Sequence, residues 1–290
     1  MKNSILIIGS DGYLGRKVVQ KLKSEFNLIC FDKYPKFPET TELDINNSDN
    51  VKKIFQENDY VVVISLAGLL PGLAKKKVLY KNNLQAGYLS KFIKQSSHFI
   101  FASSTAVYRT RSKNSVLGPF EIYGKSKLDA EELVKKYTTN YTIFRIGTMI
   151  SQDRSGGIMN ILNRLERGKA IWLPKSGNVV HPFVDVDDVV EAIALVAKEN
   201  IRGTFDLVSN DRKSLKTLAF EMNPSQKIYS SKTLDWVFSK FGNDTYPIFG
   251  ISKWHVNALF YDLRHSKNSN VFNKIKFKSM LSAVLNSLKD

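Results

Sequence analysis

The sequence SILIIGSDGYLG, which occupies residues 4–15, decides the fold of this chain. Its apolar part, residues 5–8, predicts a short buried strand, and the amphipathic stretch that follows predicts a helix. Gly9, Gly12 and Gly15 lie between them in G-x-x-G-x-x-G spacing. One glycine permits a tight turn, a second lets the backbone approach a pyrophosphate, and a third lets the helix pack closely on the strand. The stretch therefore predicts a dinucleotide-binding turn, with a ligand-free tight turn as the alternative.

Short apolar runs alternate with amphipathic stretches through the first half of the chain. We predict strands at residues 4–8, 28–31, 60–65, 99–103 and 141–145, and helices at 14–23, 50–56, 82–95 and 125–136. This alternation predicts an α/β fold, namely a Rossmann-type doubly wound parallel sheet with helices on both faces.

The pattern changes after residue 150, which indicates two parts. We predict a dinucleotide-binding Rossmann domain at 1–150 and a smaller mixed α/β C-terminal substrate lobe at 151–290. The lobe is expected to contain helices at 158–167, 187–198 and 278–288 and a strand at 204–208. Asp187 or Asp188 is expected to cap the second of these helices. Residues 184–208 are expected to return to the Rossmann domain.

The composition shows a strong excess of positive charge. The chain has 290 residues and a formal charge of +16, and its densest basic run is Lys75–Lys77. Such charge indicates an anionic partner (nucleic acid, a membrane surface or a phosphorylated substrate) or only a basic, solvated surface. No apolar run reaches the roughly 20 residues of a membrane span. The single cysteine, Cys30, excludes an internal disulfide and favours the cytoplasm.

The second predicted strand ends at Asp32, where an acid can accept hydrogen bonds from the hydroxyls of an adenosine ribose. This position favours NAD over NADP. Lys33 and Lys36 lie nearby and could instead receive a 2′-phosphate, so NADP stays open. Asp44 is a candidate for an adenine contact, although a turn-forming acid is the alternative there.

Tyr123 and Lys127 form a Tyr-x-x-x-Lys pair on one face of a predicted helix. A phenol with a pKa near 10 is a poor base, and an adjacent ammonium lowers that pKa. Tyr123 could then move a proton while hydride moves to or from a cofactor. Ser104 follows the predicted strand 99–103, where ligands bind in such sheets, and would align the reacting oxygen. Chance spacing and an ordinary Ser/Thr turn are the alternatives.

In this combination the sequence resembles the extended short-chain dehydrogenase/reductases, in particular the NAD-dependent epimerase/dehydratase family that includes UDP-galactose 4-epimerase. The resemblance implies a catalytic triad of Ser104, Tyr123 and Lys127. It also implies cofactor contacts, which we assign to Gly9, Asp11, Gly12, Tyr13, Leu14, Gly15, Asp32, Lys33, Asp44, Ile45, Leu66, Ala67, Gly68, Asn83, Tyr123 and Lys127. Relatives often form homodimers through a four-helix interface, here supplied by 82–95 and 125–136.

Three positions depart from the family pattern. The stretch 104–107 lacks the Asp-Glu pair of the family's dehydratases, which disfavours a sugar-nucleotide 4,6-dehydratase. Thr148 stands where epimerases often carry asparagine, and His181 stands where an arginine often meets the diphosphate. We name Thr105, Thr148 and His181 as candidate substrate contacts, although a histidine beside a proline is commonly structural. Other cations could replace that arginine: Arg154, Lys175, Lys253 or Arg264. The histidines show no metal-ligand spacing, so no metal is expected.

The sequence therefore predicts an NAD(P)-dependent enzyme whose small-molecule substrate is a nucleoside-diphosphate sugar, acting as an epimerase or a 4-ketoreductase. The alternatives are a reductase of another small carbonyl compound and a non-catalytic nucleotide- or RNA-binding member. Because the three catalytic candidates are all present, we expect no nucleic-acid partner.

Overall fold

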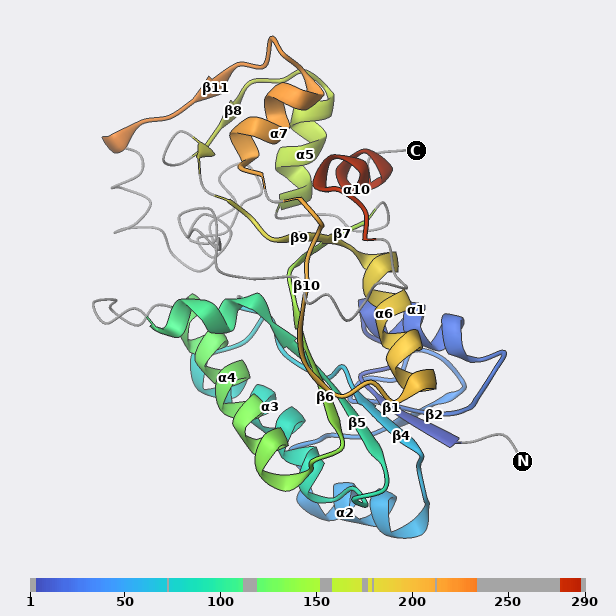
Figure 1. Cartoon of the computed structure of the whole chain (residues 1–290). Coiled ribbons are helices and arrows are strands. Elements are labelled where there is room, and N and C mark those ends of the chain that lie inside the picture. Colours follow the sequence, from blue (N-terminus) through green and yellow to red (C-terminus); the bar gives the residue numbers. More distant parts are fainter. Residues whose placement is uncertain are drawn as a thin grey trace.

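The computed structural model describes residues 4–71, 73–111, 119–151, 158–173, 177–178, 180–211, 213–233 and 277–287. Its larger part is a twisted sheet covered by helices, and a smaller lobe lies at one end of the strands (Figure 1). No helix of these residues is both long and apolar enough to cross a membrane.

The sheet has seven strands in the order β10-β6-β5-β4-β1-β2-β3, and all its pairs are parallel. The strand order reverses between β1 and β4, so a crevice opens at their carboxyl ends, where ligands bind in such sheets. The predicted doubly wound parallel sheet is confirmed. Its strands are β1 Ser4–Ile8, β2 Asn27–Asp32, β3 Thr40–Glu42, β4 Val62–Ser65, β5 His98–Ser104, β6 Tyr141–Ile146 and β10 Gly203–Leu207.

Two helical layers bury the two faces of this sheet because side chains alternate along each strand. Ile5 and Ile7 of β1 belong to the cluster that includes α1 and α6, whereas Leu6 and Ile8 belong to the cluster that includes α3 and α4. The helices are α1 Tyr13–Leu22 and α6 Val186–Glu199 on one face, and α2 Ser48–Glu57, α3 Lys76–Tyr88 and α4 Pro119–Tyr137 on the other, with short 3₁₀ helices η1 Leu89–Lys91 and η2 Thr105–Arg111.

Within the described residues, the smaller lobe contains short strands and three helices. Strand β7 Thr148–Ile150 pairs with β9 Phe183–Asp185, and β8 Ile171–Trp172 pairs with β11 Ile228–Tyr229. Its described helices are α5 Ile158–Glu166, α7 Leu215–Met222 and α10 Met280–Ser287. Its core contains Leu162, Leu165, Phe183, Leu218 and Val284. The chain leaves the large sheet after β6 and returns to it through α6 and β10.

The bounds of α3 and the cap of α6 are among the differences from the sequence prediction. Helix α3 spans Lys76–Tyr88, whereas a helix was predicted at residues 82–95. The face of α3 that contacts α4 is formed by small residues: a Cβ on Gly87 would lie 2.5 Å from the Ala130 oxygen of α4. Such a face gives little amphipathic signal. The cap of α6 is Asp185, whose carboxylate accepts from the Asp187 N–H at 2.9 Å, so the expectation that Asp187 or Asp188 caps this helix is wrong.

Candidate active site

The crevice at the carboxyl ends of the strands holds two adjoining pockets. The inner pocket is lined by residues 12–15, 68–70, 102–106 and 146–149, with Gly9, Leu66, Tyr123, Lys127 and His181. The outer pocket is lined by residues 8–9, 11–12, 32–34, 43–45 and 66–69, with Lys36 and Asn82. Gly9, Gly12, Leu66, Gly68 and Leu69 line both, so the two pockets are compartments of one elongated site.

The glycine loop forms the floor shared by the two pockets. Gly9 has φ of 87°, and a Cβ there would lie 2.7 Å from the Ala67 nitrogen. A Cβ on Gly15 would lie 2.1 Å from the Gly9 oxygen, so helix α1 packs directly on the turn. Gly12 is the N-cap of α1 and has no side chain, so no capping side chain occupies the N–H groups of the first turn. The turn therefore has the close backbone approach that a pyrophosphate needs.

Asp32 lies at the end of β2 on the wall of the outer pocket. Its carboxylate accepts hydrogen bonds from the backbone N–H groups of Asp11 and Tyr34, each at 3.1 Å. These bonds fix a carboxylate beside the glycine loop, at the position where the predicted ribose contact would be made.

The carboxylate of Asp11 binds the segment that follows β2. It accepts from the Thr40 hydroxyl at 2.7 Å and from the N–H groups of Lys36 and Phe37. Burial alone would raise the pKa of Asp11, but these hydrogen bonds and the charge of Arg16 hold it below its ordinary value. Because these bonds occupy its carboxylate, the side chain of Asp11 holds the pocket wall and is not free to meet a nucleotide.

Lys33 and Asp44 form an ion pair of 2.9 Å at the rim of the outer pocket. The hydrogen bond to Asp44 is the main cause that raises the pKa of Lys33. Asp44 also accepts from the Asn46 N–H at 2.9 Å, so it forms the turn that the sequence analysis gave as its alternative. Ile45 lines the outer pocket beside it. A 2′-phosphate would therefore compete with Asp44 for Lys33.

Asn83 does not line either pocket. Its side chain is fully buried, and it accepts from the Leu69 N–H at 2.8 Å while donating to the Leu69 oxygen and the Ser126 hydroxyl. The neighbouring Asn82 lines the outer pocket. We therefore assign Asn83 the role of holding the pocket wall, in place of the direct cofactor contact expected from the sequence.

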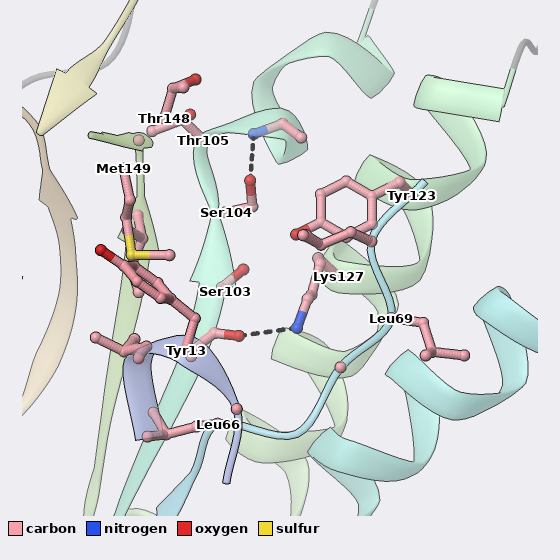
Figure 2. Close-up of a pocket in the computed structure, with 18 of the residues that line it drawn as sticks. Tyr13, Leu66, Leu69, Ser103, Ser104, Thr105, Tyr123, Lys127, Thr148 and Met149 are labelled. Atoms are coloured by element: carbon pink, nitrogen blue, oxygen red, sulfur yellow. Dashed lines mark hydrogen bonds between the residues drawn. The ribbon is translucent and has the colours of Figure 1, made fainter. Parts of the chain in front are cut away.

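The three candidate catalytic side chains meet in the inner pocket. Figure 2 shows Tyr123 reaching from α4 toward Ser104 at the end of β5, with Lys127 on the same side of the pocket. The Lys127 ammonium donates to the Ala102 oxygen at 2.9 Å, and the Ser104 hydroxyl accepts from the Ala106 N–H at 3.2 Å. Both residues from α4 are buried: Tyr123 is 7% exposed and Lys127 is 5% exposed. The pocket thus combines a phenol, a hydroxyl and an ammonium in surroundings with little water.

Burial lowers the pKa of Lys127 to about 8, and the negative charge of Glu131 opposes this shift. Glu131 is fully buried one helical turn further along α4, so it was detectable as an acid on the same face as Lys127. Its carboxylate binds the Arg145 guanidinium at 2.6 Å and accepts from the Ser103 hydroxyl at 2.6 Å. Glu131 was not among the site residues predicted from the sequence.

Arg145 extends the network across the sheet. It donates to the Tyr108 hydroxyl at 3.0 Å, and Tyr108 donates to the Asp206 carboxylate at 2.7 Å. Arg145 on β6 is in register with Ser103 on β5 and with Asp206 on β10. The network therefore ties three strands and α4 together beneath the segment that presents Ser104.

The candidate substrate residues Thr105, Thr148 and His181 all line the inner pocket. His181 is buried and stacks on Phe183, with ring centroids 6.0 Å apart. Tyr13 and Met149 form a largely apolar wall across the pocket from Tyr123 (Figure 2). Arg154, Lys175, Lys253 and Arg264, named above as possible diphosphate contacts, lie outside the described residues. The described part of the chain contains no His, Cys, Asp and Glu group that could hold a metal ion.

Comparison with known protein families gives a match over most of the large sheet. Residues 5–206 match the model of the NAD dependent epimerase/dehydratase family. This range contains the glycine loop, Ser104, Tyr123, Lys127 and the return through α6 and β10, and it confirms the resemblance found in the sequence.

One relative of known activity is N-acetyl-alpha-D-glucosaminyl-diphospho-ditrans,octacis-undecaprenol 4-epimerase from Escherichia coli O157:H7. It is 25% identical over 243 residues, which cover 78% of this chain and 73% of the relative.

Two solved structures share the fold. A dTDP-4-dehydrorhamnose reductase from Clostridium acetobutylicum has a TM-score of 0.65 at 20% identity and covers 98% of this chain, which in turn covers 97% of it. A UDP-glucose 4-epimerase from Thermotoga maritima, solved with UDP-glucose, has a TM-score of 0.59 at 22% identity, covering 79% of this chain and 86% of its own.

Proposed function

This chain belongs to the NAD dependent epimerase/dehydratase family, and we propose that it moves a hydride between NAD and a hydroxyl-bearing carbon of a diphosphate-linked sugar. The observation that carries this proposal is the meeting of Ser104, Tyr123 and Lys127 in a pocket continuous with the glycine loop. An epimerase and a 4-ketoreductase would use these residues in the same roles.

The residues of the crevice fit a bound dinucleotide. Gly9 and Gly15 leave no room for a Cβ and bring the backbone to the surface of the site, while Asp32 supplies an acceptor at the outer end. A nicotinamide cofactor held there would supply the hydride acceptor and donor for the substrate carbon. The glycine loop and Asp32 would hold the pyrophosphate and the adenosine ribose.

The protein's own residues would handle the proton. The Ser104 hydroxyl would donate a hydrogen bond to the reacting oxygen and hold it beside the Tyr123 phenol. The Lys127 ammonium would lower the pKa of that phenol, so that Tyr123 takes the proton of a substrate alcohol and gives it back to a ketone. Thr105, Thr148 and His181 would orient the sugar, because they line the same pocket.

The preference for NAD over NADP is supported by two carboxylates. Asp32 would repel a 2′-phosphate, and Asp44 already pairs with Lys33. Titration of the purified protein with NADH and with NADPH tests this preference. We expect tighter binding of NADH, and tighter binding of NADPH would contradict it.

We propose two candidate carriers of the sugar, and one of them is a nucleoside diphosphate, as in the two solved relatives. A lipid diphosphate is the second candidate, since the relative from Escherichia coli O157:H7 is named for such a substrate. The apolar residues Leu69 and Leu70 in the wall of the inner pocket favour this second class.

Nucleotide released on denaturation tests the reaction type. Stoichiometric NAD retained through purification would support an epimerase that recycles its cofactor, with UDP- and dTDP-hexoses as the first substrates to test. An empty protein that binds NADH or NADPH would support a reductase, with keto-sugar nucleotides first. Failure to bind either cofactor would refute the proposed function.

We further propose a homodimer in the cytoplasm. Helices α3 and α4 pack against each other and cover one face of the sheet, and the same pair from a second copy would complete a four-helix interface. A single cysteine agrees with a reducing compartment. Sedimentation analysis tests the dimer, and a monomer at all concentrations would contradict it.

A further inference from the structure

Residues 69–71 and 73–78, which we call the mouth segment, lie between the inner pocket and the outside of the molecule. Leu69 and Leu70 line the pocket. Beyond them the segment exposes large apolar side chains: Leu70, Leu73 and Val78 are 39%, 70% and 53% exposed. Single exposed apolar residues are ordinary, but several together beside a ligand pocket mark an interaction surface.

The same segment carries the densest basic run of the chain. Lys75, Lys76 and Lys77 are all exposed, and none of them forms an ion pair within the described residues. Lysines elsewhere on the surface do so, for example Lys94 with Asp59 and Lys198 with Glu25. The three mouth-segment lysines are therefore available to an external anion.

Helix stability does not account for these lysines. They lie at the start of α3, whose N-cap is Lys75 and whose first turn contains no acid. Cations are disfavoured at the N-terminal end of a helix because the peptide dipoles make that end positive. A run of three at this position costs stability unless an anionic partner offsets it.

We infer that the mouth segment docks on an anionic lipid bilayer, so that a sugar carried on a membrane diphosphate lipid can enter the inner pocket. Leucine and valine gain free energy at the acyl boundary, and lysines gain from the anionic headgroups. Nucleic acid would use the lysines but not Leu73 and Val78. The inference rests on the proposed function, of which it selects the lipid-linked substrate class.

Vesicle sedimentation tests the inference with the full chain. Wild-type protein is mixed with vesicles of phosphatidylglycerol and phosphatidylethanolamine, and with vesicles of phosphatidylcholine alone. We expect sedimentation with the anionic vesicles only, weakened by salt. The triple variant Lys75→Gln, Lys76→Gln, Lys77→Gln should partition roughly a hundredfold more weakly, at about fivefold per lysine. Leu73→Ser should also weaken partition.

The matched control is the triple variant Lys23→Gln, Lys52→Gln, Lys53→Gln. It removes the same charge from exposed positions at the end of α1 and on α2, away from the pocket mouth. Its partition should stay within a few-fold of the wild type. Equal losses in both triple variants would show that net charge alone acts, and would overturn the assignment to the mouth segment.

NADH titration of the same samples separates this inference from the proposed function. Wild-type protein that binds NADH but not anionic vesicles would overturn the docking inference and leave the proposed function standing. Protein that binds vesicles but no cofactor would refute the proposed function. In the supporting case, the mouth-segment variants bind NADH as the wild type does and lose only vesicle binding.

Discussion

Glu131 lies one helical turn after Lys127 on α4, fully buried and bonded to Arg145 and Ser103. Its charge favours the ammonium form of Lys127, which burial otherwise disfavours. The same carboxylate holds the end of β5 through Ser103, next to Ser104. One acid therefore links the charge of the lysine to the placement of the serine.

Replacing this acid should narrow the pH range in which Lys127 is charged. In Glu131→Gln the opposing charge is lost, so the pKa of Lys127 should fall below the present value of about 8. The ¹³Cε shift of labelled Lys127 measures this directly without cofactor. Turnover should then fall at neutral pH, because an uncharged lysine no longer lowers the pKa of Tyr123.

The control for this variant is Glu132→Gln, which removes an exposed acid paired with Lys135 on the same helix. Its Lys127 titration should match the wild type. Glu131→Gln breaks the buried Glu131–Arg145 pair, and breaking such a pair costs about 3 to 5 kcal/mol of stability. Ser103→Ala keeps this pair and is therefore the milder companion variant. An unchanged Lys127 pKa in folded Glu131→Gln would contradict the linkage.

Lys127 should also make stability depend on alkaline pH. Its folded pKa of about 8 lies below its ordinary value of 10.5, so the unfolded chain binds more protons between these values. The free energy of unfolding should therefore rise with pH across this window, by roughly 3 kcal/mol from this group. Urea unfolding of the wild type and of Lys127→Met at several pH values measures the difference. Parallel pH profiles for the two proteins would rule out a buried, titrating Lys127.

Tyr123→Phe should separate chemistry from binding. The phenol oxygen is the proposed proton carrier, and general acid–base catalysis contributes about 10² to 10⁴ in rate. We expect turnover to fall by about that factor, while the Kd for NADH changes much less, because only the predicted cofactor contact of the Tyr123 hydroxyl is lost and the glycine loop and Asp32 are untouched. Steady-state kinetics and cofactor titration measure the two effects. Unchanged turnover would remove Tyr123 from the mechanism.

Two glycines of the same loop should respond differently to alanine. A Cβ on Gly15 would lie 2.1 Å from the Gly9 oxygen, so Gly15→Ala must displace α1 and should destabilise the fold by several kcal/mol, roughly as overpacking does. A Cβ on Gly12 would lie 3.3 Å from the same oxygen, which needs only a small shift. Gly12→Ala should therefore keep its thermal midpoint near the wild type yet bind NADH more weakly. Equal thermal midpoints for both variants would contradict the packing argument.

Strands β1, β4, β5 and β6 were predictable from the sequence because they are short apolar runs that are largely buried, whereas the edge strand β3 Thr40–Glu42 was not predicted. The glycine spacing, Asp32 and the Tyr123–Lys127 pair also follow from local sequence, and the structure brings Ser104, Tyr123 and Lys127 into one pocket. Helix α3 was misplaced because Asn83 and Gly87, which it buries, carry no hydrophobic signal. The strands β7, β8, β9 and β11 have two or three residues each, too few for any period to appear.

Partners that lie far apart in the chain could not be predicted. Arg145 and Asp206 meet only because β6 and β10 are neighbours, although 61 residues separate them. Asn83 resembles a cofactor contact by position, and only the fold shows that Leu69 and Ser126 occupy its side chain.

The place of β10 has a consequence for synthesis of the chain. β10 pairs with β6, which would otherwise be the edge of the sheet. Along the sequence, however, β10 ends at Leu207, long after β6 has ended at Ile146. Until the ribosome has made that strand, β6 exposes unpaired backbone groups that can pair with another chain. A fragment that stops near residue 150 should therefore aggregate, and one that extends past Val208 should stay dispersed far better.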